Sequence, residues 1–268
     1  MDWSKAKTIL IIAFLILNIF MLIMLAFNSA NVSITSDYIR YSKDYLTAKN
    51  IEIRADIPRV PRYTGKVLYS TREYDIDALC RLVFGKKVPL SENEGAMEIV
   101  VGEEMIIFSE DELNIKDRIS EGEQWFSDIK TFEDRLIKYL KNIGFKKSEL
   151  LLIKSSETEQ EKELIFDVKY KNLKVYDQQI TAQVNKESIL TLSVPAKMIK
   201  KENGTGQVIS AYQILVMGGL PSNIVVENID IGYRRISKGD LYGVPMWCIT
   251  TDDGAIWFFN GFTGEQLD

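Results

Sequence analysis

The stretch from Thr8 to Phe27, TILIIAFLILNIFMLIMLAF, contains no charged residue. At about 1.5 Å per residue, a helix of this length spans about 30 Å, the thickness of the hydrocarbon core of a membrane. Lys5 and Lys7 precede the stretch, and basic residues favour the cytoplasmic side of a membrane. The sequence therefore predicts a cytoplasmic tail at 1–7, a single transmembrane helix at 8–27 and an extracytoplasmic body.

A cleaved signal peptide is the alternative interpretation of this segment. Its apolar stretch would be shorter, roughly 7 to 15 residues, and would end at a cleavage site of small residues. Asn28-Ser29-Ala30 matches such a site only weakly. We therefore expect a retained membrane anchor.

Asn18 is the only strongly polar side chain within the predicted span. In hydrocarbon, an amide gains roughly 0.6 to 2 kcal/mol by hydrogen bonding to another helix. One interpretation is therefore a contact with a second membrane helix through Asn18 and its neighbours Phe14, Leu17 and Met21. The other is that Asn18 is merely tolerated and the helix serves only as an anchor.

The composition of the whole chain excludes several classes of function. Its 268 residues are 46% hydrophobic and 26% charged, as in globular proteins. A net charge of −5 and a pI of about 5.1 provide no basic surface for a phosphate backbone, so no nucleic-acid partner is expected. Histidine is absent, which removes the commonest general base and a common metal ligand. We expect no metal and no other cofactor.

The two cysteines, Cys80 and Cys248, both lie in apolar sequence contexts. Buried free thiols are favoured, because cysteine often behaves as a small buried hydrophobe. Pairing outside the cytoplasm is the open alternative.

After the span, residues 28–50 are predicted to form a helical or partly ordered stalk, with Tyr38, Tyr41 and Tyr45 at helical spacing. The body is expected to start near Ile51 and to repeat one organisation, a helix followed by several strands. The predicted units are 51–126, 127–200 and 201–268. The expected fold class is therefore α+β, with helices laid on antiparallel sheets.

The helices of the body have distinct sequence signals. Residues 75–85 carry an apolar stripe that ends at Gly85, and a second helix begins at Ser127-Asp128 and ends at Gly144. A third is predicted from Gln207 to about Met217, after a linker at 200–204. Strand-like runs occupy 97–101, 105–108, 164–170, 174–184, 188–194, 224–235, 244–250 and 255–260.

Three acidic pairs are candidates for catalysis: Glu103 with Glu104, Glu121 with Glu123, and Asp252 with Asp253. Paired carboxylates act as acid and base in glycoside hydrolysis, but only at a defined separation in space. Asp252-Asp253 also lacks the ladder of ligands typical of a calcium loop, and with Gly254 it is a hairpin-turn signal. Because solvated turns are the ordinary place for such residues, we expect no enzymatic activity.

Aromatic residues are concentrated near the C-terminus, with Trp247, Trp257 and Phe259 among them. Aromatic side chains often dominate binding interfaces, so these three are candidates for a contact surface. Aromatic residues are also typical of strands, and filling of a core is the favoured interpretation.

The opening MDWSKAKTI at 1–9, followed by FLILNIF at 14–20, resembles the N-terminus of the YycI (WalI) family of Gram-positive bacteria. The segment from Trp247 through Trp257 to NGFTGE at 260–265 also resembles the end of that family, and the closing hairpin of PepSY-type modules. The resemblance implies a PepSY-like fold in the C-terminal half of an exported body.

It further implies a regulator of the Yyc/Wal two-component system, which controls cell-wall metabolism. Such a regulator acts on a sensor histidine kinase of the YycG/WalK type in the membrane, together with the sister protein YycH. The alternative function is an extracytoplasmic module that binds cell wall or peptide through its aromatic residues. The family offers no catalytic motif to carry over.

Overall fold

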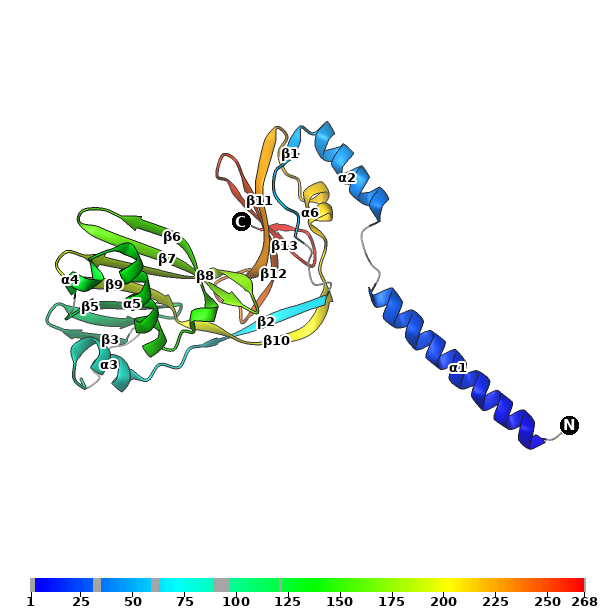
Figure 1. Ribbon diagram of the computed structural model, residues 1–268, viewed down its shortest axis with the longest axis horizontal. Coiled ribbons are helices and arrows are strands. Elements are labelled where there is room, and N and C mark those ends of the chain that lie inside the picture. Colours follow the sequence, from blue (N-terminus) through cyan, green and yellow to red (C-terminus); the bar gives the residue numbers. More distant parts are fainter. Residues whose placement is uncertain (1–2, 31–34, 59–62, 89–96, 121, 268) are drawn as a thin grey trace. The chain divides into compact units, whose positions relative to one another are not determined.

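The computed structural model describes residues 3–30, 35–58, 63–88, 97–120 and 122–267. The chain divides into two compact units, residues 1–49 and 50–268. Together the described elements give an α+β fold, and Figure 1 shows their order along the chain.

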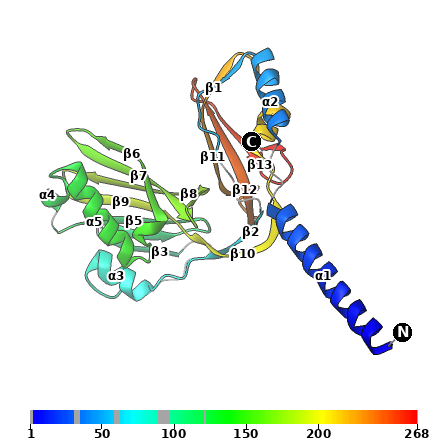
Figure 2. The ribbon, with the colours of Figure 1, turned by 45° about the vertical axis from the view of Figure 1, so that its right-hand side comes forward.

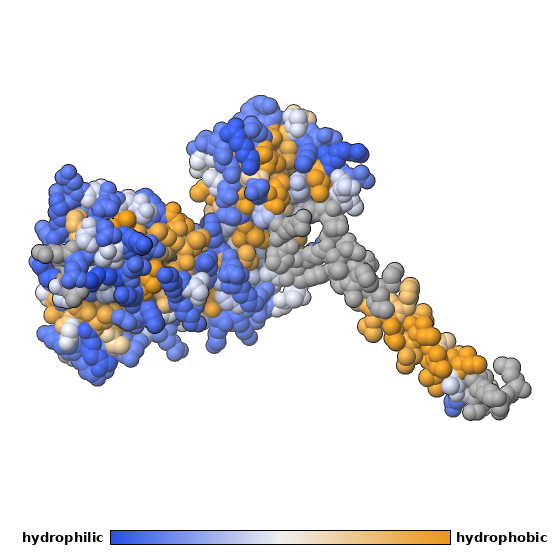
Figure 3. Space-filling view, in the orientation of Figure 1, coloured by the Kyte–Doolittle hydropathy of each residue, from blue (hydrophilic) through white to orange (hydrophobic). Residues whose placement is uncertain are grey.

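The first unit contains two helices, α1 (Trp3–Ala30) and α2 (Ser36–Ala48). Exposed apolar side chains predominate over residues 9–22 of α1 (Figure 3). Searched over the described residues, the structure contains no helix that is long and apolar enough to cross a membrane. The span predicted at 8–27 therefore stays a prediction.

Helix α2 lies within the predicted stalk, of which residues 31–34 fall outside the described part of the chain. Thr35 caps the helix by accepting a hydrogen bond from the backbone N–H of Tyr38 at 3.3 Å. The rings of Tyr38 and Tyr41 are 6.2 Å apart, and those of Tyr41 and Tyr45 are 6.4 Å apart. The helical spacing of these tyrosines is thereby confirmed.

The second unit is built on one mixed sheet with the strand order β10-β2-β12-β11-β8-β9-β5-β4-β3, to which β1, β6, β7, β13 and β14 attach. Its strands are β1 (Ile51–Ile53), β2 (Tyr63–Thr71), β3 (Met97–Val101), β4 (Glu104–Phe108), β5 (Glu112–Arg118), β6 (Leu150–Glu157), β7 (Glu161–Tyr170), β8 (Leu173–Asn185), β9 (Ile189–Pro195), β10 (Lys197–Gln207), β11 (Ile224–Arg235), β12 (Tyr242–Thr251), β13 (Ile256–Asn260) and β14 (Gln266–Leu267).

The helices of this unit are α3 (Ile76–Phe84), α4 (Gly122–Trp125), α5 (Ile129–Asn142) and α6 (Ala211–Met217), with a 3-10 turn at Lys147–Glu149. Asp75 and Asp128 cap α3 and α5 through their carboxylates, and Gly85 follows α3 in the left-handed conformation, with φ of 66°. These two helices are confirmed. Helix α6 starts four residues later than predicted from Gln207, at a capping box of Ser210 and Gln213.

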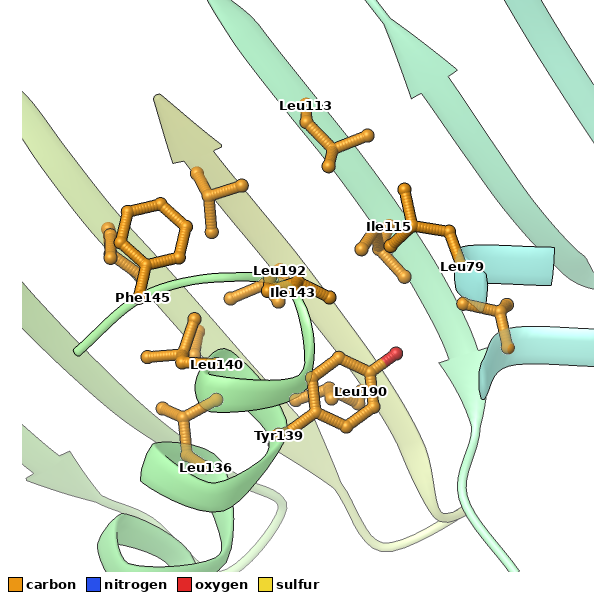
Figure 4. Close-up of a cluster of buried hydrophobic side chains, with 14 of the residues drawn as sticks. Leu79, Leu113, Ile115, Leu136, Tyr139, Leu140, Ile143, Phe145, Leu190 and Leu192 are labelled. Atoms are coloured by element: carbon orange, nitrogen blue, oxygen red, sulfur yellow. The ribbon is translucent and has the colours of Figure 1, made fainter. Parts of the chain in front are cut away.

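Helices α3 and α5 pack on the same face of the sheet half that runs from β7 to β3 (Figure 2). Their apolar faces contribute Leu79, Val83, Phe132, Leu136 and Leu140 to a buried core. The inward residues of strands β3 to β9 complete this core, including Leu113, Ile115, Leu190 and Leu192 in Figure 4. Burial of these stripes is what holds both helices to the sheet.

Strand β8 joins the two halves of the sheet: one contains β6, β7, β9, β5, β4 and β3, and the other contains β10, β2, β12 and β11 with β1, β13 and β14. Its later residues pair antiparallel with β9, and Lys174 and Val175 near its start pair in parallel with Gly232 and Tyr233 of β11. Opposite β7, the register passes from the pair Asp167–Gln179 directly to Val168–Val175. Residues 176–178 therefore form a bulge in β8, at the point where the sheet changes from one half to the other.

The sequence-based description of the body needs three corrections. Strands β1, β2, β5, β6, β10 and β14 were not expected. The linker predicted at 200–204 is wrong, because these residues belong to β10, an outer strand whose charged side chains suit an edge. The sheet is mixed rather than purely antiparallel, since β11 is parallel to both β1 and β8.

Other expectations agree with the structure. The runs at 97–101 and 105–108 are β3 and β4, those at 164–194 are the antiparallel meander β7-β8-β9, and the last three are β11, β12 and β13. Gly254, with φ of 84°, lies in the predicted hairpin turn. The division into units at residues 126 and 200 stays a prediction, because one sheet runs through all three segments.

The close approach of β11 to β8 requires a glycine at position 232. A Cβ atom there would lie 2.4 Å from the carbonyl oxygen of Lys174 and 2.6 Å from the ring of Tyr176. We expect Gly232→Ala to lower the free energy of unfolding by about 1 to 3 kcal/mol, as overpacking does. Thermal unfolding of the full-length chain measures this. Gly239→Ala is the matched control, because nothing lies within 4 Å of its added Cβ; equal melting temperatures for the two variants would contradict the prediction.

Candidate functional site

A pocket of about 420 Å³ lies between α3, α5 and the ends of strands β4 and β5. Its wall is apolar and aromatic on one side, with Leu82, Val83 and Phe84 from α3, Trp125 from α4 and Tyr139 from α5. Its polar groups come from the strands, where Glu104, Asp117 and Arg118 line it. Such a combination of apolar walls and a few polar groups is typical of small-molecule sites.

Asp117 is the buried acid of this pocket. In β5, Leu113, Ile115 and Asp117 alternate with outward residues, so the carboxyl occupies the next inward position of a core stripe. The residue is only 4% exposed. The hydroxyl of Tyr139 donates a hydrogen bond of 2.8 Å to its Oδ2.

Burial raises the pKa of Asp117 to about 6, because the charged form loses its hydration. The hydrogen bond from Tyr139 acts in the opposite direction, and the nearby charge of Glu104 adds to the increase. Burial and the Asp117 carboxylate together hold the pKa of Tyr139 well above its usual value, so Tyr139 remains a neutral donor.

The aromatic wall is fixed by packing. The rings of Trp125 and Tyr139 lie edge to face with centroids 6.1 Å apart, and Trp125 also contacts Phe132 at 6.2 Å. Figure 4 shows Tyr139 between the buried leucines of α5 and the strands, with its oxygen pointing away from the helix. The hydroxyl is therefore held in position by the core on which α5 rests.

At the rim of the pocket, Arg118 forms an ion pair with Glu103. This contact holds the pKa of Glu103 below its usual range. Of the predicted pair Glu103 and Glu104, the first is thus engaged at the surface, whereas the second faces the pocket.

A second polar cluster lies at the joint between the sheet halves. Arg235 donates from Nε to Asp177 at 2.6 Å and from Nη1 to Asp111 at 3.1 Å and to the carbonyl of Lys238 at 2.6 Å. The hydroxyl of Tyr69 donates to the other oxygen of Asp177 at 2.8 Å. A cleft of about 340 Å³ lies beside this network. Since its central charges are bonded to one another, the network has the character of a structural joint.

The three aromatic candidates are not gathered at a surface. Trp247 and Phe259 are fully buried, and the indole N–H of Trp247 donates to the carbonyl of Ile209 at 2.8 Å. This is the placement that core filling predicts, and it leaves neither side chain free to form a contact surface. Trp257 is half-buried.

On α1, the proposed contact residues Phe14, Leu17 and Met21 are exposed, at 67%, 54% and 61%. The amide Nδ2 of Asn18 donates to the carbonyl of Phe14, one turn earlier, at 2.8 Å. An amide has a second N–H and a carbonyl oxygen, so this bond leaves Asn18 able to reach another helix.

The other acidic pairs lie apart from the pocket. Asp253 accepts bonds from Thr251 and from the backbone of Ala255 within the hairpin turn, which lowers its pKa. Glu121 and the side chain of Glu123 lie outside the described residues. Across the part of the chain that is described, no three acidic or thiol groups gather as they would around a metal ion. Cys80 and Cys248 are buried free thiols, as favoured.

Asp117 was not predicted as a site residue because strand β5 was not predicted from the sequence. The signal is present: Leu113, Ile115, Asp117 and Ile119 alternate with polar residues, so a carboxyl occupies an inward position of a strand. Tyr139 falls on the same helix face as Phe132 and Leu136, and only the structure brings it to Asp117.

Among solved structures, an uncharacterized protein from Eubacterium rectale is similar to this chain, with a TM-score of 0.50 and 11% identity. The match covers 82% of this chain and 91% of that one, and at this identity it shows a shared fold alone. The C-terminal domain of YpeB from Bacillus megaterium matches with a TM-score of 0.38 and 14% identity, over 74% of this chain and 96% of that one. No curated protein sequence matches the chain.

The protein is thus an α+β protein with one large mixed sheet and an acid-containing pocket. Residues 30–262 match the family described as YycI protein, and the chain belongs to the YycI family. The resemblance noted in the sequence is confirmed. Membership of this family implies a regulator in the Yyc two-component system. A PepSY-like arrangement in the C-terminal half stays a prediction.

The buried Asp117 makes the stability of the native protein depend on pH. An aspartate in an unfolded chain ionises near pH 4, whereas the pKa of Asp117 in the folded protein is about 6. The folded state therefore binds more protons between these values and loses stability as the pH rises through them. Asp117→Asn keeps the acceptor for Tyr139 and removes the charge. We expect it to exceed the wild type in stability by up to about 3 kcal/mol at pH 7.5.

Thermal unfolding at pH 4, 5, 6 and 7.5 tests this expectation, and the difference should shrink towards pH 4. Asp252→Asn, at an exposed position in a turn, is the matched control. A constant difference at every pH would show that the Asp117 carboxyl does not titrate as described.

The Arg235 network should be a major source of stability for the joint. Arg235→Met leaves Asp177 without its cation, and breaking a buried ion pair in this way costs about 3 to 5 kcal/mol. Arg54→Met removes an exposed arginine that also bonds two carboxylates, those of Glu52 and Glu227, and should change the melting temperature little. Denaturant unfolding of both variants compares the buried and exposed networks, and equal effects would refute the assignment.

Proposed function

We propose that this protein is a membrane-anchored, non-enzymatic regulator of the sensor histidine kinase of the Yyc/Wal system. The observation that carries the proposal is the match of residues 30–262 to the YycI family. In this proposal residues 8–27 cross the membrane, the N-terminus is cytoplasmic, and the body lies outside the cytoplasm. A YycH-like protein acts with it.

Contact between membrane helices is the proposed route of regulation. Phe14, Leu17, Asn18 and Met21 follow the spacing of one helix face, and their side chains are exposed in α1. In hydrocarbon, the apolar members of this face have no hydrophobic driving force towards another helix, so the hydrogen bonding of the Asn18 amide is the feature that most distinguishes a helix partner from lipid. In this proposal, the contact regulates the kinase by shifting the equilibrium between two arrangements of its membrane helices.

The arrangement of the body supports a regulator better than a wall-binding module. Two of the three aromatic candidates, Trp247 and Phe259, fill the core instead of a surface. The acidic candidates Glu103 and Asp253 are held by an ion pair and by turn hydrogen bonds, respectively. Of the three aromatic candidates, only the half-buried Trp257 is still available for the alternative function, binding of cell wall or peptide.

A photoreactive residue at position 18 tests the helix contact in membranes. We expect crosslinks to a histidine kinase or a YycH-like protein, identified by mass spectrometry. The matched control places the same residue at Phe20, which lies about 200° around the helix and is also exposed. Capture of lipid alone from position 18, or the same proteins in equal yield from both positions, would contradict a contact through the Asn18 face.

Replacement of residues 8–27 by an unrelated apolar helix tests whether the span regulates or only anchors. We expect kinase output, measured by a reporter of its target genes, to change on replacement. Return of Phe14, Leu17, Asn18 and Met21 to the foreign helix should restore part of the native output. If output is unchanged by the replacement, the span serves only as an anchor.

A further inference from the structure

Asp117 is a buried acid on the wall of a pocket, and among the described residues it has no cation as an ion-pair partner. The structure gives it one hydrogen bond, from the neutral hydroxyl of Tyr139. The adjacent Arg118 points to the rim and pairs with Glu103. No lysine or arginine of the described residues forms an ion pair with Asp117, and the negative charge of Glu104 raises its pKa further. An ionised carboxylate here is costly without a cation.

The pocket beside this carboxyl has room and walls for an organic group. Its volume of about 420 Å³ lies within the range of small-molecule sites. Leu82, Val83 and Phe84 provide apolar contact for an aliphatic stem, and the rings of Trp125 and Tyr139 provide aromatic surface that attracts a cation.

We infer that this pocket binds a primary alkylammonium group, with the ammonium on the carboxylate of Asp117 and its aliphatic stem against the α3 wall. The site is independent of the helix contact proposed for regulation, so each can fail without the other.

Other classes of ligand fit the lining less well. An anion would meet Asp117 and Glu104, while Arg118, which also lines the pocket, is paired with Glu103. A hard metal ion takes six or more oxygen ligands, whereas much of this lining is apolar. An ammonium group needs few acceptors, and its attached carbons match the apolar wall.

Binding should be coupled to release of a proton. The groups that face Asp117 are Tyr139 from α5, Glu104 from β4 and the rim residue Arg118 from β5, while the lining residues of α3 are uncharged. The ammonium requires the ionised carboxyl, and the pKa of Asp117 is about 6. Affinity should therefore be about tenfold weaker at pH 5 than at pH 7.5, since about nine-tenths of the carboxyl is then protonated.

Calorimetric titration of the full-length chain in nanodiscs of zwitterionic lipid tests the site, with n-butylammonium as the probe. n-Butanol has the same stem without the charge, and empty nanodiscs give the background. We expect saturable binding of butylammonium at pH 7.5, at least tenfold tighter than that of butanol. Asp117→Asn should weaken it at least tenfold and abolish its dependence on pH, while Asp252→Asn leaves it unchanged.

Leu82→Phe narrows the pocket and keeps the carboxyl, so it should weaken butylammonium without altering the pH dependence of stability that belongs to Asp117. This second variant separates loss of the site from loss of the fold. Absence of saturable binding to the wild type, equal binding of butanol, or undiminished binding to Asp117→Asn would each overturn the proposal.

Discussion

The fold of the body depends on a three-residue bulge in β8, where Asp177 is held between Tyr69 and Arg235. Residues 176–178 leave the register of β7 at the point where β8 also pairs with β11. The bulge turns the carboxylate of Asp177 to within 2.8 Å of the Tyr69 hydroxyl and 2.6 Å of Arg235 Nε. The adjacent Gln178 donates to the carbonyl of Lys197 at 3.1 Å. Strands β2, β8, β10 and β11 are thus tied together by side chains where the backbone ladder is interrupted, which fixes how one sheet half continues into the other.

The position of the pocket follows from this joint. Because β8 is fixed at the joint, its antiparallel partner β9 and then β5 are placed in register beside it. Asp117 lies on the inward face of β5, below α5. Packing of Leu136 and Leu140 in the core holds α5 at the distance from the sheet at which the Tyr139 hydroxyl contacts the Asp117 carboxyl. An acid–hydroxyl contact over 22 positions of sequence is therefore a consequence of strand register and helix packing.

Short-range sequence signals predicted the helices and turns whose residue types suit the positions that they occupy in the fold. The helices that start at Asp75 and at Ser127-Asp128, with their apolar stripes, and the hairpin at Gly254 follow from short-range chemistry and were predicted from the sequence. The edge strand β10 was not predicted, because its polar residues, such as Lys201 and Glu202, do not alternate with apolar ones. The sequence therefore shows no apolar face there. The parallel pairing of β8 with β11 depends on contacts between distant segments, which no local pattern encodes. Asp117 was missed for a different reason: the alternation of its strand is visible in the sequence, but a polar residue occupies a position where the pattern requires an apolar one.

Two acids of this body are held in different ways, and the difference separates structural from ligand-binding roles. Asp177 has a guanidinium and a hydroxyl as partners, so its charge is satisfied within the fold and contributes to the joint. Asp117 is more deeply buried, and among the described residues its hydrogen-bond partner is the hydroxyl of Tyr139 alone. Replacing Asp117 with an apolar residue would remove the desolvation cost, so core packing alone gives no reason for a carboxyl at this position. The missing partner is a cation, and the open pocket beside Asp117 is where one has room to bind.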